Sequence, residues 1–293
     1  MQFVGCSGAH YWAREFTKFG HIVKLMAPKF VAPYRMSGER GKNDAADAAA
    51  ICEAVQRPNM RFVPVKSEVD QSRLAVHTTR QGFVCARTAV INRLRGLLSE
   101  FGIVMPHKAK TVRLQAAAQL EKLPQWMHTV GSDLLDELRQ LDERVATYDG
   151  YISMMAAADD RAKKLMAVPG IGPTTASALL ASLGNGHDFT NGRQLAAWLG
   201  LVPGQYSSGG KQRLGRITKA GDSYLRTLLI LGGRVVLAAA KDKQDRLSRW
   251  AVALAERRGY WKAAVAFAAK NARMAWAMLA KGEALKPLSP TAP

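Results

Sequence analysis

Hydrophobic and polar positions in the first part of the chain alternate between the spacing of helices and that of strands. Apolar residues at helical spacing predict a helix over Ala9–Phe19, and the apolar run that follows predicts a buried strand over 23–26. The stretch 28–42 is broken by proline, glycine and polar residues, which predicts a loop. An alanine-rich helix is expected over 43–55, and a strand over 60–66 whose internal proline suits only an edge or a strand end. This order of elements is typical of an α/β unit.

From residue 67 the spacing becomes that of long helices. Between Leu134 and Met155 the apolar residues alternate in steps of four and three, the seam of a coiled coil over about three heptads. A second long helix is predicted over 68–101, with apolar residues at three- or four-residue spacing. The two predict an antiparallel hairpin or a dimerising stalk, and the alternative is a pair of ordinary amphipathic helices on a globular core. The seam residues are Leu134, Leu138, Leu141, Val145, Tyr148, Ile152 and Met155.

After residue 160 the chain consists of short apolar runs separated by glycines, which predicts short helices. The fold class expected from the whole pattern is mixed and mostly α. We divide the chain into an α/β part over 1–66, a helical stalk over 67–160, a helical domain over 161–285 and a disordered tail over 286–293.

The net charge of the chain limits the classes of function that it can have. Lysine and arginine number 42 against 23 acidic residues, a formal net charge of +19, and residues 205–293 alone hold 17 against 5. So strong a basic excess indicates a polyanionic partner, with nucleic acid ahead of a ribosomal or membrane-surface role. No uncharged apolar run approaches the ~18 residues that a membrane span needs, so no membrane partner is expected. The N-terminal sequence lacks the pattern of a signal peptide, and we expect a cytoplasmic protein.

Two carboxylates stand at the start of the predicted helix over 43–55. Asp44 and Asp47 are three residues apart, which places them on one face of a helix. Paired carboxylates of this kind can bind Mg²⁺, which prefers hard oxygen ligands and serves phosphodiester chemistry. The alternative is structural, because acidic residues in a first helical turn interact favourably with the helix dipole.

The segment VPGIGP over 168–173 precedes an apolar run and has the form of a helix-hairpin-helix turn. Its glycines, Gly170 and Gly172, let backbone amides approach a phosphate, and the N-terminus of a following helix favours the anion. The alternative is a plain turn between two helices. The basic composition of the chain favours the phosphate interpretation.

A third segment, QYSSGGKQRLGR over 205–216, combines serines, glycines and cations. A serine in a flexible turn can attack phosphorus while neighbouring cations stabilise the charge on the transferred phosphate. Because a serine nucleophile normally needs activation and no histidine lies nearby in sequence, a phosphate-binding loop is an equal alternative. The cations of the segment and its flank are Lys211, Arg213, Arg216 and Lys219.

These segments, taken in order, resemble one family. The runs CSGAHYWAREF, KNDAADAAAICEAVQRPNMRFVPVKS, VPGIGPTTASALLASLG, AAWLGLVPG and SSGGKQRLGRITKAGDSYLRTLL are similar to the serine-bearing DEDD transposases of the IS110 and IS1111 insertion sequences. The similarity covers nearly the whole chain. It implies a RuvC-like acidic domain with an RNase H fold, incomplete in this chain, followed by a coiled coil and a helical transposase domain.

The resemblance also implies roles for single residues. Asp44 and Asp47 match the last two acids of the family's tetrad, which bind magnesium. Ser208 matches the nucleophile that forms a covalent link to DNA, with Ser207 as its substitute. Family members act as oligomers, so a dimer or tetramer is expected, and they use an RNA from the element's non-coding end to choose target and donor DNA. DNA and a guide RNA are therefore the implied partners, with the bacterial nucleoid as the implied location.

Two features depart from the family pattern. The opening strand that bears the first Asp of the tetrad is not in this chain, and Phe3-Val4-Gly5 before Cys6 contains no acid. We therefore expect a transposase truncated at its N-terminus, with half of the tetrad. DNA recombination through Ser208 is the first hypothesis, and a non-catalytic nucleic-acid-binding remnant of such a transposase is the second.

Overall fold

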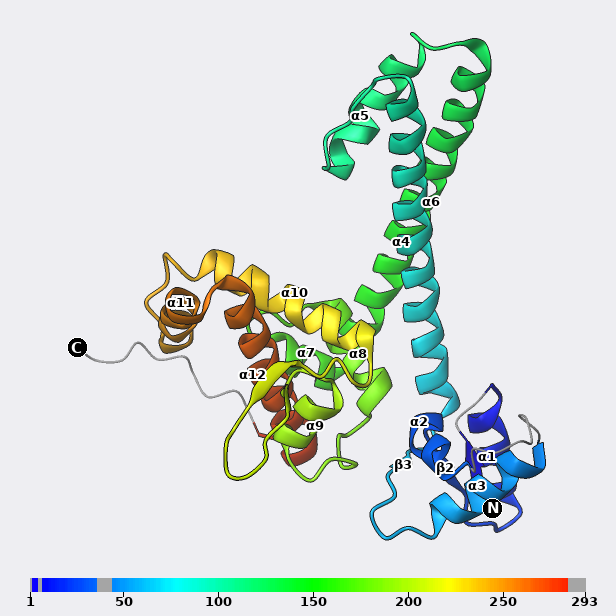
Figure 1. Cartoon of the computed structure of the whole chain (residues 1–293), viewed down its shortest axis with the longest axis vertical. Coiled ribbons are helices and arrows are strands. Elements are labelled where there is room, and N and C mark those ends of the chain that lie inside the picture. The colour runs from blue at the N-terminus through cyan, green and yellow to red at the C-terminus, as the bar shows by residue number, and fades with distance from the viewer. Residues whose placement is uncertain (1, 5–6, 36–43, 284–293) are drawn as a thin grey trace. The chain divides into compact units, whose positions relative to one another are not determined.

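The computed structural model describes residues 2–4, 7–35 and 44–283. It falls into two compact units, Met1–Gln71 and Ser72–Pro293, and the described residues are mostly α-helical, as the sequence predicts (Figure 1). The predicted tail over 286–293 and the position of Cys6 lie outside the described residues.

A small three-stranded sheet organises the first unit. Strand β1 (Gln2–Val4) leads through helix α1 (Ala9–Lys18) to strand β2 (Lys24–Met26), which pairs with β1 in parallel. Strand β3 (Phe62–Val63) pairs with β2 in the antiparallel direction, so β2 lies between the other two. The predicted helix and strands are confirmed, and β3 lies at the sheet edge and ends before Pro64, where a proline is tolerated.

The predicted loop over 28–42 is wrong in its first part. Helix α2 (Pro28–Val31) and the 3₁₀ helix η1 (Ala32–Tyr34) occupy it, each with a proline in its first turn, where the missing N–H costs nothing. Residues 36–42 are not described. Helix α3 (Asp44–Val55) follows and packs through small side chains. The buried residues of this layer are Met26, Val31, Ala50 and Ala54.

Two long helices, α4 (Glu68–Glu100) from Ser72 onward and the whole of α6 (Gln125–Ala158), form the predicted antiparallel hairpin in the second unit. Helix α4 runs beside α6, with the short α5 (Ala109–Leu120) between them in sequence (Figure 1). Their direction follows from two ion pairs, Arg80 with Asp149 and Arg87 with Asp142, in which α4 advances as α6 recedes. The predicted seam is largely buried, because Leu134, Leu138, Leu141, Val145 and Ile152 face inward. Dimerisation through this hairpin stays a prediction.

The rest of the second unit packs short helices around a long last one. Helix α12 contacts α9, α10 and α11, and its small residues Ala268, Ala272 and Ala275 lie in the main core. No described helix is long and apolar enough to cross a membrane. The helices are α7 (Asp160–Met166), α8 (Pro173–Leu183), α9 (Gly192–Trp198), α10 (Ser223–Ala239), α11 (Arg246–Arg258) and α12 (Tyr260–Lys281).

Candidate functional site

The segment with the serines forms a β-hairpin between α9 and α10. Strands β4 (Pro203–Gln205) and β5 (Leu214–Ile217) pair in the antiparallel direction. At the tip, the Lys211 amide donates to the Ser208 carbonyl at 3.0 Å, which closes a tight turn. The two central residues, Gly209 and Gly210, have φ of 55° and 75°. A turn with positive φ at both central positions matches the twist of a hairpin and strongly favours glycine, so this pair sets the tip geometry.

The two neighbouring serines differ in their hydrogen bonds. The Ser207 Oγ accepts from the Gln205 Nε2 at 2.9 Å and from the Arg213 amide at 3.1 Å. A hydroxyl oxygen has two lone pairs, so both are engaged. Ser208 is also exposed, and no hydrogen bond of its side chain is found among the described residues. A nucleophile attacks through a lone pair, and only Ser208 has one that is not already held by the hairpin.

Four cations lie along this hairpin, from the tip to the residues just after β5, and have no acidic partners among the described residues. Lys211, Arg213, Arg216 and Lys219 are all exposed, and none of them forms an ion pair within the part of the chain that the structure describes. The hairpin therefore presents four positive charges to solvent, an arrangement that favours binding of a phosphate backbone. An exposed tyrosine, Tyr206, stands among them and was not predicted from the sequence. The sequence feature that could have indicated it is an aromatic residue inside a basic loop, because nucleic-acid bases stack on such rings.

The base of the hairpin, which we call the root (198–202 and 218–222), is closely packed. A Cβ on Gly200 would come within 2.4 Å of the Ala220 nitrogen, and one on Gly221 within 1.9 Å of the Trp198 oxygen. The Arg226 Nη1 donates to the carbonyls of Leu199 and Ala220, each at 3.0 Å, and so joins both sides of the root.

Lys219 in this root has an unusual backbone conformation. Its φ is 54°, a left-handed value that costs a residue with a side chain about 1 kcal/mol or more. Its amide donates to the Gly200 carbonyl at 3.2 Å, so the root holds the conformation in place. The strain fixes the direction in which this predicted phosphate-binding lysine leaves the backbone.

A buried polar network lies beside the first turn of α10. His77 of α4 is 1 % exposed, and its ring nitrogens lie 3.1 Å from the Tyr224 hydroxyl and 3.1 Å from the Ser177 Oγ. Burial, and then the positive charge of Arg80, lowers the pKa of His77 to about 4. Arg80 in turn is ion-paired with Asp149 at 2.5 Å. The network ties α4, α6, α8 and α10 together with a neutral imidazole at its centre.

The predicted helix-hairpin-helix segment over 168–173 joins α7 to α8. Gly170 has a φ of 85° and faces α10, where its added Cβ would lie 2.8 Å from the Gly232 carbonyl oxygen. Gly172 is exposed and precedes the first residue of α8, with open space around it. Gly170 therefore allows a close backbone packing, whereas Gly172 leaves the helix N-terminus accessible. Phosphate binding by this turn stays a prediction.

The acidic pair lies in the first unit, and the serine hairpin lies in the second. Asp44 is exposed at the start of α3, and Asp47 forms an ion pair with Arg35 at 2.9 Å. Among the described residues no cluster of three histidine, cysteine or acidic side chains is placed to hold a metal ion. Two carboxylates, one of them neutralised by an arginine, do not by themselves fit a magnesium site, which is octahedral and needs more oxygen ligands.

Comparison with known proteins places these features in a family. The model of the Transposase IS116/IS110/IS902 family matches residues 162–249. A probable family 20 transposase of Pseudomonas aeruginosa is 47 % identical over 287 residues, which cover 96 % of this chain and 84 % of that protein. The chain belongs to this transposase family. The transposase for insertion sequence element IS1111A of Coxiella burnetii is 42 % identical over 95 % of this chain and 77 % of its own length. The transposase for insertion sequence element IS1328 of Yersinia enterocolitica is 37 % identical, and the match covers 94 % of this chain and 82 % of that protein.

The family match confirms the resemblance drawn from the sequence motifs. Within this transposase, the matched residues 162–249 contain both the turn over 168–173 and the whole serine hairpin. Asp44, Asp47 and His77 lie outside that range. The roles of the individual residues rest on their chemistry and are proposals.

Proposed function

We propose that this transposase exchanges DNA strands with the Ser208 hydroxyl as its nucleophile. The observation that supports Ser208 over its neighbour is the hydrogen bonding of the hairpin, in which both lone pairs of the Ser207 oxygen are occupied. Ser208 directly precedes a turn of two glycines with no other atoms within 4 Å of their added Cβ positions, so a bulky phosphodiester can approach it.

The proposed step is a transesterification. The Ser208 oxygen loses its proton to solvent and forms a bond to phosphorus, while the bond from phosphorus to one deoxyribose oxygen breaks and that oxygen takes up a proton. The strand is then held as a serine phosphodiester, and a second deoxyribose hydroxyl reverses the step to make the new joint. The cations Lys211, Arg213, Arg216 and Lys219 hold the phosphates and offset the charge that develops on the transferred one.

The other partners belong to the same proposal. Family membership and the net charge of +19 support binding to DNA. A guide RNA and assembly into a dimer or tetramer are proposed from the resemblance to insertion-sequence transposases. Magnesium binding by Asp44 and Asp47 also remains a proposal, in which Arg35 must first release Asp47. No step of the strand exchange above depends on a metal.

A second function is supported by the exposed cations of the hairpin. Lys211, Arg213, Arg216 and Lys219 can bind phosphates whether or not Ser208 reacts, so the alternative is a protein that binds nucleic acid without cutting it. Such a protein would bind with a steep dependence on salt and without forming a covalent product.

The deciding experiment is a search for a covalent protein–DNA adduct. The full chain is incubated with labelled DNA that flanks its own gene, and products are separated under denaturing conditions. We expect an adduct with the native chain and with Ser207→Ala, and complete loss with Ser208→Ala. Mass spectrometry of the adduct should locate the phosphate on Ser208. An adduct that persists in Ser208→Ala would disprove the nucleophile assignment, and salt-sensitive binding without any adduct would establish the second function.

A further inference from the structure

A run of basic and aromatic residues joins the last two helices. Helix α11 ends at Arg258 and α12 begins at Tyr260, and Gly259 between them has a φ of 88°. The junction reads Arg257-Arg258-Gly259-Tyr260-Trp261-Lys262. Interleaved cations and aromatic rings are the composition with which proteins bind single-stranded nucleic acid. This junction is separate from the serine hairpin, and none of the residues assigned to strand exchange above belongs to it.

Trp261 is held in place while most of its ring faces solvent. It is 62 % exposed, and the Arg234 guanidinium lies over its ring, 4.9 Å from the centroid. The Tyr260 ring meets it edge-on at 5.6 Å, and the Tyr260 hydroxyl donates to the Arg234 carbonyl at 3.3 Å. An indole fixed on one face by a cation has its position set before any ligand arrives. An incoming base therefore meets a ready stacking surface.

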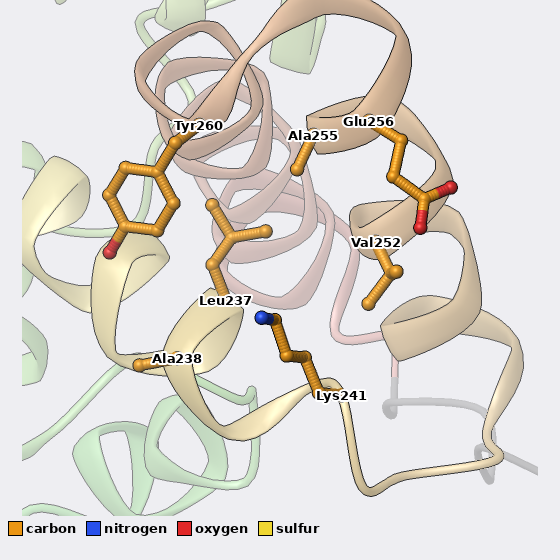
Figure 2. A pocket seen from close by; sticks show the side chains of 7 residues that line it. All are labelled: Leu237, Ala238, Lys241, Val252, Ala255, Glu256 and Tyr260. Carbon is orange, nitrogen blue, oxygen red and sulfur yellow. The ribbon is translucent and has the colours of Figure 1, made fainter.

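A pocket lined in part by Tyr260 opens at this junction. Its volume is about 510 Å³, and it lies between the end of α10, helix α11 and the start of α12 (Figure 2). Its lining is mostly apolar, but the Lys241 ammonium group points in among the apolar side chains and the Glu256 carboxylate lies to one side (Figure 2). A nucleobase combines apolar faces with a polar edge of donors and acceptors, so both kinds of lining have a counterpart in it. The lining side chains include Leu237, Val252, Ala255, Lys241, Glu256 and Tyr260.

The charge around the pocket is complementary to a polyanion. Residues 241–262 hold seven lysines and arginines against three acidic residues. One of those acids, Asp245, is already used to cap α11, where it accepts from the amides of Leu247 and Ser248. No ion pair involves Arg257, Arg258 or Lys262 within the described part of the chain.

We propose that this surface, formed by Lys241, Glu256, Arg257, Arg258, Tyr260, Trp261 and Lys262 and called here the α11–α12 corner, binds an unpaired nucleic-acid strand. One base stacks on the open face of Trp261, and the adjoining base enters the pocket, where Lys241 donates to its acceptors and Glu256 accepts from its donors. Arg257, Arg258 and Lys262 bind the phosphates. A duplex binds there far more weakly, because its bases are already stacked on one another.

The test compares two exposed tryptophans of the full chain. Trp261→Ala is set against Trp126→Ala, since Trp126 on α6 is 83 % exposed and lies far along the chain from the corner. Affinity is measured by fluorescence anisotropy with labelled oligothymidylate, oligouridylate and a DNA duplex of matched length. We expect Trp261→Ala to weaken binding of the single strands by about tenfold, the effect of one stacked base, and duplex binding by less than about twofold. Trp126→Ala should change neither.

Two more variants separate stacking from folding. Trp261→Phe retains a ring and should recover most of the affinity, and Ala238→Met on an exposed pocket position should weaken single-strand binding several-fold by filling the space that a base would occupy. The preferred oligonucleotide identifies the strand as DNA or RNA. Equal loss of single-strand and duplex binding in Trp261→Ala would overturn the proposal, as would unchanged single-strand binding in that variant. Ser208→Ala should bind all probes normally, so failure here and failure of the proposed nucleophile are distinguishable.

Discussion

The root and the tip of the serine hairpin both contain two glycines, but for opposite reasons. At the root, Gly200 and Gly221 are pressed against backbone atoms, and a Cβ on either would overlap a neighbour. At the tip, Gly209 and Gly210 have nothing within 4 Å of an added Cβ. The root glycines allow the chain to pack, whereas the tip glycines allow it to turn and leave space around Ser208. Packing against neighbouring backbone therefore determines the conformation of the root, whereas the turn alone determines that of the tip.

This difference separates the root, which stabilises the hairpin, from the tip, where we propose the reaction. The root is connected to the core by Arg226, and the adjacent Tyr224 is connected to His77. The tip carries the exposed Ser208 and the unpaired Lys211, whereas Lys219 leaves the backbone from the root. Residues that bind or react are commonly placed on loops that a rigid scaffold positions.

The largest effect is expected from a substitution at the root. Gly221→Ala would place a methyl group 1.9 Å from the Trp198 oxygen at a φ of 70°, so both packing and backbone oppose it. We expect the free energy of unfolding to fall by about 3 kcal/mol or more. The measurement is urea unfolding of the full chain, followed by circular dichroism. Gly209→Ala is the matched control at the tip, where only the positive φ opposes the methyl and about 1 kcal/mol should be lost. Equal losses in the two variants would refute the distinction between root and tip.

A smaller effect on the free energy of unfolding is expected from a fall in pH, through His77, whose partner Tyr224 is adjacent to the root. The pKa of His77 is about 4 in the folded chain and about 6.5 when unfolded. The unfolded chain therefore binds more protons between these values, and stability is lost as pH falls through that window. From pH 7 to pH 5 we expect a loss of about 1 to 2 kcal/mol through His77.

The His77→Gln variant isolates this contribution. Glutamine does not titrate but can still hydrogen-bond Ser177 and Tyr224, so the slope of unfolding free energy against pH should become shallower. Burial also lowers the pKa of His10, which lies in the other unit and serves as the unchanged background in both proteins. An identical slope in the variant would show that His77 does not titrate as described.

The smallest effect is local to the tip. Ser207→Ala removes the acceptor of the Arg213 amide, a bond worth about 1 kcal/mol, so hydrogen exchange at that amide should quicken about fivefold. Ser208→Ala removes no hydrogen bond found among the described residues and should leave that rate unchanged. Site-resolved exchange by NMR or mass spectrometry would measure both. Faster exchange in Ser208→Ala would mean that the second serine also supports the hairpin.

Local sequence patterns located α1, α3, α4 and α6 and predicted the antiparallel hairpin of α4 and α6, whereas α5 was missed and only short helices without bounds were predicted after residue 160. The heptad seam was predictable because apolar residues spaced by three and four positions fall on the same face of a helix. Their spacing therefore indicates which residues of α6 are buried. The short helices after Pro28 were missed, since a proline fits the first turn of a helix as well as it fits a loop.

Contacts between distant parts of the chain were not predictable in this way. His77 meets Ser177 and Tyr224, which are 100 and 147 residues away, and nothing in its own neighbourhood marks it as buried. The sequence likewise placed Ser207 and Ser208 in one motif but gave no physical reason to separate them. Only the hydrogen bonds to Gln205 and Arg213 distinguish the two hydroxyls.

Gly170 and Gly232 pack against each other, so a substitution at one of them cannot be compensated by a substitution at the other. A side chain on either residue would overlap the other's carbonyl group, and the partner is already the smallest amino acid. A change at one position thus has no second change that relieves it. The turn before α8 and the middle of α10 must move as one piece, and any rearrangement that carries the serine hairpin toward DNA through α10 would carry that turn with it.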